Sequence, residues 1–176
     1  AIMHQGKIRQ IGIASELYDK PEDLFVAGFI GSPSMNFLDC TLEKENFLVS
    51  DTFTIEISKN LAKEITKYTT SSELILGVRP GDISLHKKEE SNSIGAEVYA
   101  IEPLGSEIIV DLMLGDQIIK VSTPPTYKTV PGNKVWMTFN MDRIHILDKK
   151  TEKTITQFQK HFGYKSSCAT LFNGAV

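Results

Sequence analysis

The chain has 176 residues, of which 41% are apolar and 23% are charged. This composition is typical of a globular protein and excludes a fibrous or wholly disordered one. The formal charge of −3 is unevenly distributed. Residues 1–147 hold 14 Lys/Arg and 20 Asp/Glu, while residues 148–176 hold 5 Lys/Arg and 2 Asp/Glu.

The acidic body argues against a nucleic-acid partner, because it repels phosphate backbones. No apolar run approaches the roughly 20 residues that a membrane-spanning helix needs. Cys40 and Cys168 are far apart and have no metal-ligand spacing. Two such thiols favour a reducing compartment, with Cys40 as a small buried residue.

The first 31 residues predict a hairpin followed by two short helices. Two strand-like runs flank Gly6, which supplies the positive φ of a tight turn. Ser15 is the expected N-cap of the first helix, which ends before Pro21. Pro21 suits the first position of a second helix that stops at Gly31. This second helix is too apolar to stand alone in water.

From residue 32 onward the pattern is that of short strands. Ser32-Pro33-Ser34 is a turn, and one helical pattern over residues 58–68 interrupts the strands. No strand is expected between residues 79 and 93. Short strands with one interposed helix favour a small β-barrel or sandwich, with the oligonucleotide/oligosaccharide-binding (OB) barrel as the nearest type. The expected strands are residues 37–42, 47–50, 52–57, 74–78, 94–101, 107–114, 117–122, 135–139 and 143–147.

These patterns divide the chain into three parts. Residues 1–31 form the hairpin and helices, and residues 32–150 form a mainly β domain. Residues 151–176 lose periodicity, and we expect a frayed, disordered terminus or residues added to the natural chain.

The sequence contains no catalytic constellation. The only Gly-Lys pair, Gly6-Lys7, lacks the upstream glycine of a phosphate-binding loop. G-x-S-x-G, H-E-x-x-H and C-x-x-C motifs are also missing, and the four histidines are scattered singly. We therefore expect no catalytic, cofactor-binding or metal-binding residue in this chain.

Arg79 follows the apolar run 74–78 and precedes Pro80 and Asp82. Its planar guanidinium suits a bidentate ion pair. Two interpretations remain open: a pair that crosses an interface to another subunit, or an intramolecular pair that pins a loop.

Three phrases, in order, resemble the C-terminal portion of the ATP-binding subunits of sugar-type ABC importers, such as the maltose systems. The resemblance extends over about residues 1–155. The phrases are Gln5-Gly6-Lys7-Ile8-Arg9-Gln10-Ile11-Gly12, then Phe25-Val26-Ala27-Gly28-Phe29-Ile30-Gly31-Ser32-Pro33 with Met35-Asn36-Phe37-Leu38, then Leu76-Gly77-Val78-Arg79-Pro80 with Asp82-Ile83.

The resemblance implies that residues 1–31 end an ABC ATPase domain and that residues 32–150 form a regulatory OB-type barrel, the TOBE domain. It implies a homodimer held through this barrel, membrane permease subunits bound through the ATPase domain and, in some members, a regulatory protein. It also implies a cytoplasmic location at the inner face of the cell membrane. ATP and Mg would bind to segments that this sequence lacks, so we expect no ATP hydrolysis by this chain alone.

The resemblance also marks a set of hinge or interface candidates. We expect the apolar helix around Phe29 to dock firmly, while the Gly-Ser-Pro break lets the chain change direction. Gly81 stands where the family usually has a glutamate, which puts any ion pair of that glutamate in doubt. The candidates are Phe29, Gly31, Ser32, Pro33, Met35, Asn36, Phe37, Arg79, Pro80 and Asp82.

A second function class remains open beside this one. The domain could be a free-standing OB-like barrel that senses a small ligand, such as a sugar or an oxyanion. The sequence does not name a transported solute under either interpretation.

Overall fold

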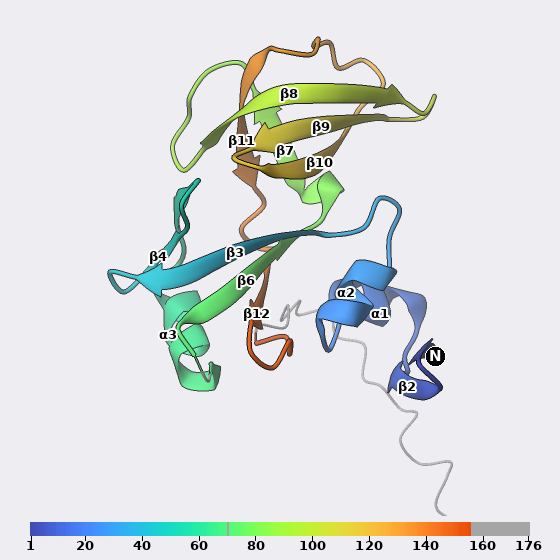
Figure 1. Ribbon diagram of the computed structural model, residues 1–176, viewed down its shortest axis with the longest axis vertical. Helices are drawn as coiled ribbons and strands as arrows, with labels where there is room; N and C mark the ends of the chain where they lie inside the picture. The colour runs from blue at the N-terminus through green and yellow to red at the C-terminus, as the bar shows by residue number, and fades with distance from the viewer. Residues whose placement is uncertain (70, 156–176) are drawn as a thin grey trace, which may run out of the picture.

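A computed structural model of the chain describes residues 1–69 and 71–155. Within these residues the fold is mainly β, as predicted, with two five-stranded antiparallel sheets and a separate hairpin (Figure 1). No helix in this part of the chain is long and apolar enough to cross a membrane. Cys168 and His161 lie outside the described residues.

The N-terminal segment is built as predicted, except at the helix starts. Its elements are β1 (Ile2–His4), β2 (Lys7–Gln10), α1 (Ala14–Asp19) and α2 (Leu24–Phe29). Ser15 is not an N-cap, because α1 already begins at Ala14. Pro21 lies before α2, whose N-cap is Asp23: its carboxylate accepts a hydrogen bond from the Val26 N–H at 3.0 Å. The carboxylate satisfies a backbone donor that proline cannot, so the helix starts later.

The first sheet has the strand order β12-β6-β3-β4-β5. The interposed helix α3 (Lys59–Tyr68) lies where the sequence predicts it, and its N-cap Ser58 accepts from the Leu61 N–H at 3.2 Å. The strands are β3 (Asn36–Glu43), β4 (Phe47–Val49), β5 (Thr54–Glu56), β6 (Glu73–Val78) and β12 (His145–Asp148).

The second sheet has the order β10-β9-β8-β11-β7 and contains one strand that the sequence did not predict. Residues 79–93 were expected to hold no strand, but a 3-10 turn, η1 (Pro80–Asp82), leads into β7 (Ile83–His86). β7 forms because it pairs with β11, with Ile83 opposite Phe139. The other strands are β8 (Ile94–Pro103), β9 (Ile108–Leu114), β10 (Gln117–Thr123) and β11 (Lys134–Phe139).

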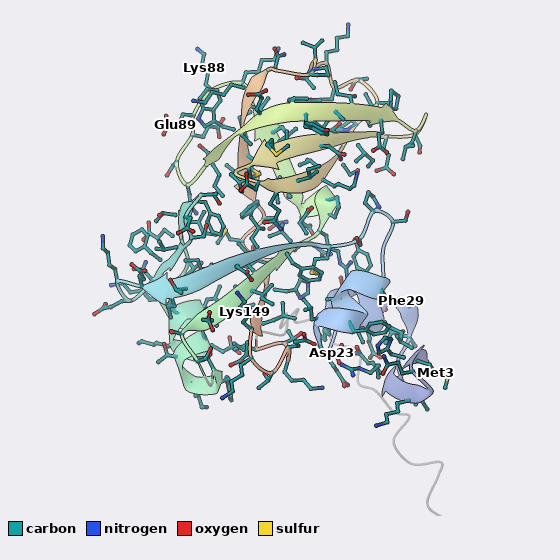
Figure 2. The ribbon with its side chains drawn as sticks, in the orientation of Figure 1. Met3, Asp23, Phe29, Lys88, Glu89 and Lys149 are labelled. Atoms are coloured by element: carbon teal, nitrogen blue, oxygen red, sulfur yellow. The ribbon has the colours of Figure 1, made fainter. Side chains whose placement is uncertain are left out.

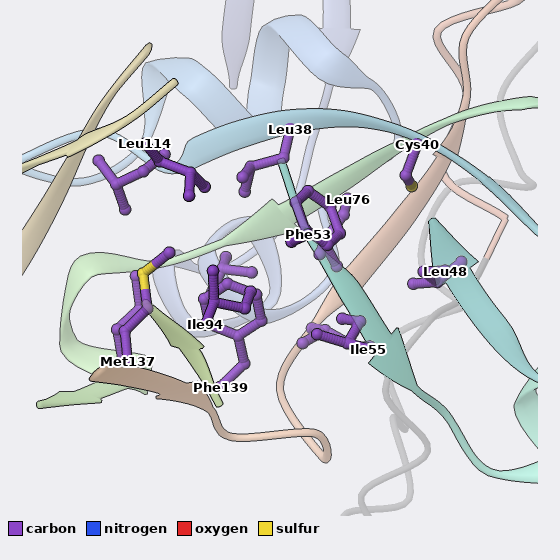
Figure 3. Packing of buried hydrophobic residues seen from close by; sticks show 14 of the residues in the cluster. Leu38, Cys40, Leu48, Phe53, Ile55, Leu76, Ile94, Leu114, Met137 and Phe139 are labelled. Carbon is purple, nitrogen blue, oxygen red and sulfur yellow. The ribbon is translucent and has the colours of Figure 1, made fainter. Parts of the chain in front are cut away.

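Both sheets bury their apolar faces in one core (Figure 3). Leu38 and Leu76 of the first sheet belong to the same cluster as Leu112 and Met137 of the second, and all four side chains are at most 1% exposed. Burial of each such side chain contributes about 1.5–3 kcal/mol. Cys40 lies in this core, as predicted, where burial raises the pKa of its thiol to about 12. The two sheets therefore form a single unit.

The N-terminal segment has only a small core of its own. Ile2, Leu17 and Val26 are buried together, and Phe25 and Ile30 pack partly against them. Figure 1 shows this segment beside β3 and β6 and clear of the second sheet.

Candidate functional site: the joint around Arg79

The joint lies where the chain passes from α2 into β3. Gly31 has a φ of 122°, a conformation that favours glycine. A Cβ at Gly31 would lie 3.1 Å from Nη1 of Arg79 and 3.2 Å from the Pro33 carbonyl oxygen. The Ser32–Pro33 peptide bond is cis. The conformation of Gly31 and its close contacts place a tight turn next to the guanidinium of Arg79.

Arg79 is 2% exposed and holds the ends of both N-terminal helices. Nη1 donates to the carbonyl oxygen of Ile30 at 2.6 Å, and Nη2 donates to that of Tyr18 at 2.6 Å. The guanidinium carbon also lies 3.7 Å from the centre of the Tyr18 ring. These carbonyls are at helix C-termini, where backbone acceptors lack partners and the helix dipole is negative. One buried cation thus satisfies two helix ends.

Burial lowers the pKa of Arg79 from its ordinary value, while Tyr18 and the nearby carboxylates of Asp82 and Asp19 oppose this shift. An arginine stays protonated despite such a shift. A buried positive charge needs compensation, and here it comes from backbone dipoles and an aromatic face. Within the described residues, the Arg79 guanidinium contacts two backbone carbonyl groups and the Tyr18 ring in place of the expected ion pair.

The carboxylate of Asp82 serves a different arginine. Its Oδ1 lies 2.8 Å from Nε of Arg143, whose Nη2 lies 3.2 Å from Oδ1 of Asp19 at the end of α1. Burial alone would lower the pKa of Arg143, but the hydrogen bond and charge of Asp82, followed by those of Asp19, raise it. A second contact thus holds the N-terminal segment to the sheets, and no sequence pattern predicted it.

Asn36 joins the two sheets. Its Nδ2 donates to the carbonyl oxygens of Val78 at 3.2 Å and Lys120 at 2.9 Å, and its Oδ1 accepts from the Lys120 N–H at 2.8 Å. The neighbouring Gln117 side chain donates to the Phe37 carbonyl oxygen. These bonds fix the end of β3 against β10.

Met35 and Phe37 lie two residues apart next to this crossing, and Phe37 is paired with Gly77 of β6. The sulfur of Met35 would be 2.7 Å from a Cβ at Gly77, so only glycine leaves room for it. The Phe37 ring lies 3.3 Å from a Cβ placed on Gly28 of α2. Pro80 is buried and begins η1. Most hinge candidates therefore gather at one place in the fold.

Phe29 is the exception. Its side chain is 61% exposed and stacks on Phe25, with ring centres 5.7 Å apart. Figure 2 shows Phe29 and Met3 on the outer side of the N-terminal segment. The expectation that Phe29 docks α2 against the barrel is wrong, because the buried residues of that helix are Val26 and Ala27. Phe29 is the last residue of α2 and stacks on Phe25, four residues earlier, at the exposed edge of the segment.

A strap of residues 152–154 makes a further attachment that the sequence did not reveal. The Leu24 N–H donates to the Glu152 carbonyl at 2.9 Å, and the Thr154 N–H donates to that of Glu22 at 3.1 Å. Thr154 Oγ1 donates to the Pro21 carbonyl at 2.7 Å. These backbone bonds bring the chain beyond β12 back onto the N-terminal segment.

Asp23 lies under this strap and is 1% exposed. Besides capping α2, its carboxylate lies 2.7 Å from Nη2 of Arg9 and 3.8 Å from Nζ of Lys153. One side chain thus links the hairpin, α2 and the strap. Figure 2 places Asp23 between these elements.

The side chains of the joint hold structural elements in place. Within residues 1–69 and 71–155, no group of three His, Cys, Asp or Glu side chains is placed to hold a metal ion. The buried cation, the amide of Asn36 and the strap all satisfy backbone groups of this chain. The arrangement fixes one set of elements relative to another.

Two family models match adjoining parts of the chain. The MalK OB fold domain matches residues 31–83, and the TOBE domain matches residues 76–147. The two matches overlap at residues 76–83, which contain the end of β6 and Arg79. The OB and TOBE assignment is thereby confirmed.

Curated relatives match over most of the chain. The multiple sugar-binding transport ATP-binding protein MsmK of Streptococcus mutans is 37% identical over 85% of this chain and 41% of its own length. The trehalose/maltose import ATP-binding protein MalK of Thermococcus litoralis is 35% identical over 88% of this chain and 43% of its own. The sulfoquinovosyl glycerol transport ATP-binding protein SmoE of Agrobacterium fabrum is 29% identical over 88% of this chain and 42% of its own length. The chain spans about two fifths of the length of these relatives.

A solved structure shares the fold. The cytoplasmic molybdate-binding protein ModG, crystallised with molybdate, matches with a TM-score of 0.50 and 12% identity, over 63% of this chain and 94% of that one. From the two domain matches and the relatives together, the chain carries the OB and TOBE domains found in sugar ABC importer ATP-binding subunits.

Proposed function

We propose that this chain is the regulatory and dimerisation part of the ATP-binding subunit of an importer for carbohydrates. Residues 1–31 belong to the ATPase domain, and the two sheets form the barrel that contacts a second subunit. ATP and Mg bind to the ATPase domain, and permease subunits bind that domain at the inner face of the membrane.

The observation that carries this proposal is the exposed apolar surface of the N-terminal segment. The exposed fractions of five large side chains there range from 58% to 70%: Met3, Ile8, Ile11, Ile13 and Phe29. A segment of this size with so much apolar surface in water is typical of part of a larger domain. The importer relatives extend well beyond the matched region, which supplies such a domain.

The joint explains how movement would pass between the two parts. Arg79, Arg143 and the strap attach the segment to the barrel at separate points. A segment held at several points moves with the barrel as one body. Closure of the ATPase domains would therefore be limited by the contact between the barrels.

A chimera tests the proposal. Residues 1–155 replace the matching part of MsmK, and we expect the fusion to hydrolyse ATP. The double substitution Ile8→Asp and Phe29→Asp should abolish soluble, active fusion, since it places charges at a domain core. Tyr99→Asp is the matched control, because Tyr99 is 58% exposed on the barrel. Equal activity of the double variant and the control would contradict the proposal.

Light scattering on the 176-residue chain addresses the barrel contact. We expect a dimer without added ligand. A monomer that binds a sugar or an oxyanion in calorimetry would instead support the free-standing sensor left open by the sequence.

A further inference from the structure

A row of lysines runs along the outer face of α3. Lys59, Lys63 and Lys67 are four residues apart, so they share one side of the helix over about 12 Å. All three are exposed, and none forms an ion pair within residues 1–69 and 71–155. Lys67 Nζ lies 4.9 Å from the centre of the Tyr68 ring, which is also exposed.

Two features of this row oppose helix stability, although Lys67 stands in the last turn, where the helix dipole favours a cation. Like charges four residues apart repel each other. Lys59 stands in the first turn of α3, where the helix dipole favours acidic residues and where none is present. Local rules are broken most often at functional sites, so the row calls for a role outside the isolated fold.

The row borders a groove. A cavity of about 500 Å³ lies along the helix and is lined by Glu45, Lys59, Ala62, Lys63, Thr66 and Lys67. The lining thus holds three lysines and a single carboxylate, that of Glu45. The small side chains of Ala62 and Thr66 lie between the lysines. In Figure 1, α3 is at the opposite end of the molecule from β8, and the three lysine side chains are exposed.

We propose that α3 is a docking site for an acidic segment of a partner protein. Carboxylates of the segment pair with the lysines, and small apolar side chains enter the groove between them. The body of the chain holds 14 Lys/Arg against 20 Asp/Glu over residues 1–147. Outside the short row, this body repels an extended polyanion such as nucleic acid or an anionic membrane. A short acidic segment can contact the three lysines without approaching the acidic surface elsewhere on the chain.

The proposal stands independently of the importer function. The lysine row is on the barrel, and the apolar surface tested by the chimera is on the N-terminal segment. Failure of either experiment leaves the other inference intact.

The test uses the 176-residue chain, labelled with ¹⁵N, and a synthetic helical peptide of about 15 residues. The peptide carries three glutamates spaced by four, with alanine and leucine between them. A second peptide has lysine in place of each glutamate. We expect the acidic peptide alone to shift the amide signals of α3, with binding that weakens as salt is added.

Two variants separate the row from general charge. Lys59→Gln with Lys63→Gln and Lys67→Gln should weaken binding by about tenfold or more, since each exposed pair contributes about two- to fivefold. Its melting temperature should stay the same or rise, because the repulsion is removed. Lys87→Gln with Lys88→Gln and Lys128→Gln removes equal charge elsewhere and should leave the affinity unchanged. Lys63→Gln alone should weaken binding by about two- to fivefold with the helix intact.

Other outcomes overturn the proposal. Equal weakening by both triple variants would show attraction to charge in general. Shifts of α3 by phosphatidylserine vesicles or duplex DNA, without any by the peptide, would assign the face to a polyanion. Self-association that is lost in the α3 variant would assign it to a second copy of the chain.

Discussion

The two parts of this molecule are stabilised in different ways. The two sheets share one continuous apolar core, in which many side chains are almost fully buried. The N-terminal segment buries few apolar side chains, among them Ile2, Leu17, Val26 and Ala27, and leaves others such as Ile11 and Phe29 exposed. Its position depends on polar contacts, among them those of Arg79, Asp23 and Thr154. Non-directional burial sets the stability of the barrel, and directional bonds set the position of the segment.

From this difference we expect the segment to be released at a lower free energy than the barrel unfolds. Regions with few buried apolar contacts open at lower free energy than a core.

The largest effect is expected in the barrel core. Leu76→Ala removes a side chain that is fully buried between both sheets, at a cost of about 3–5 kcal/mol. Thermal unfolding followed by circular dichroism should show one transition at a lower temperature. If only the N-terminal segment loosened, the separation of the two parts would be wrong.

Arg79→Met should release the N-terminal segment. The change leaves the carbonyl groups of Tyr18 and Ile30 without their donor, at a cost of about 2–4 kcal/mol to the joint. Hydrogen exchange should accelerate in residues 1–31 and stay slow in β9. Arg79→Lys keeps the charge but lacks the planar group that donates to both carbonyls, so it should have an intermediate effect. Equal loss of protection in β9 would contradict this prediction.

Acid should weaken the molecule at His145, which is 2% exposed at the joint. Burial, followed by the charges of Arg79 and Arg143, lowers the pKa of His145 from 6.5 to about 4. Between these two pKa values, His145 binds a proton in the unfolded chain but not in the folded chain. The free energy of unfolding therefore falls as the pH drops from about 6.5 toward 4. Between pH 7 and pH 5 the loss is about 2 kcal/mol.

The control for this prediction is His145→Asn, which does not titrate. Urea unfolding at both pH values should show a smaller difference for the variant than for the parent chain. An equal difference would assign the acid sensitivity to other groups.

The smallest effect is expected in the strap. Thr154→Val removes the hydrogen bond to the Pro21 carbonyl and keeps the side-chain shape, at a cost of about 1 kcal/mol. Proteolysis within residues 1–31 should become faster, while Thr126→Val, an exposed change on the barrel, should have no effect. Unchanged proteolysis would show that the strap does not stabilise the segment.

Sequence patterns predicted the parts that depend on local chemistry. The β3 and β8 strands follow from short β-prone runs, and α3 follows from apolar positions that share one face. β7 was missed because the run Ile83–His86 is short and becomes a strand only by pairing with β11.

The joint could be predicted only in part, for a related reason. The sequence marked Arg79 and Asn36, but their partners are backbone groups of Tyr18, Ile30 and Lys120, which carry no side-chain signal. The strap unites residues far apart in the chain, and neither end has a distinctive composition. The location of the site was therefore visible from the sequence, and its bonding was not.

The amide of Asn36 has a consequence for assembly. β10 is an end strand of its sheet, and the free backbone groups of such a strand invite edge-to-edge aggregation. At Lys120 both of these groups are already occupied by one side chain. A strand from another molecule would have to displace the Asn36 amide before it could pair along the whole of β10. A continuous intermolecular sheet is therefore blocked at this edge, and copies of the barrel would meet there through side chains.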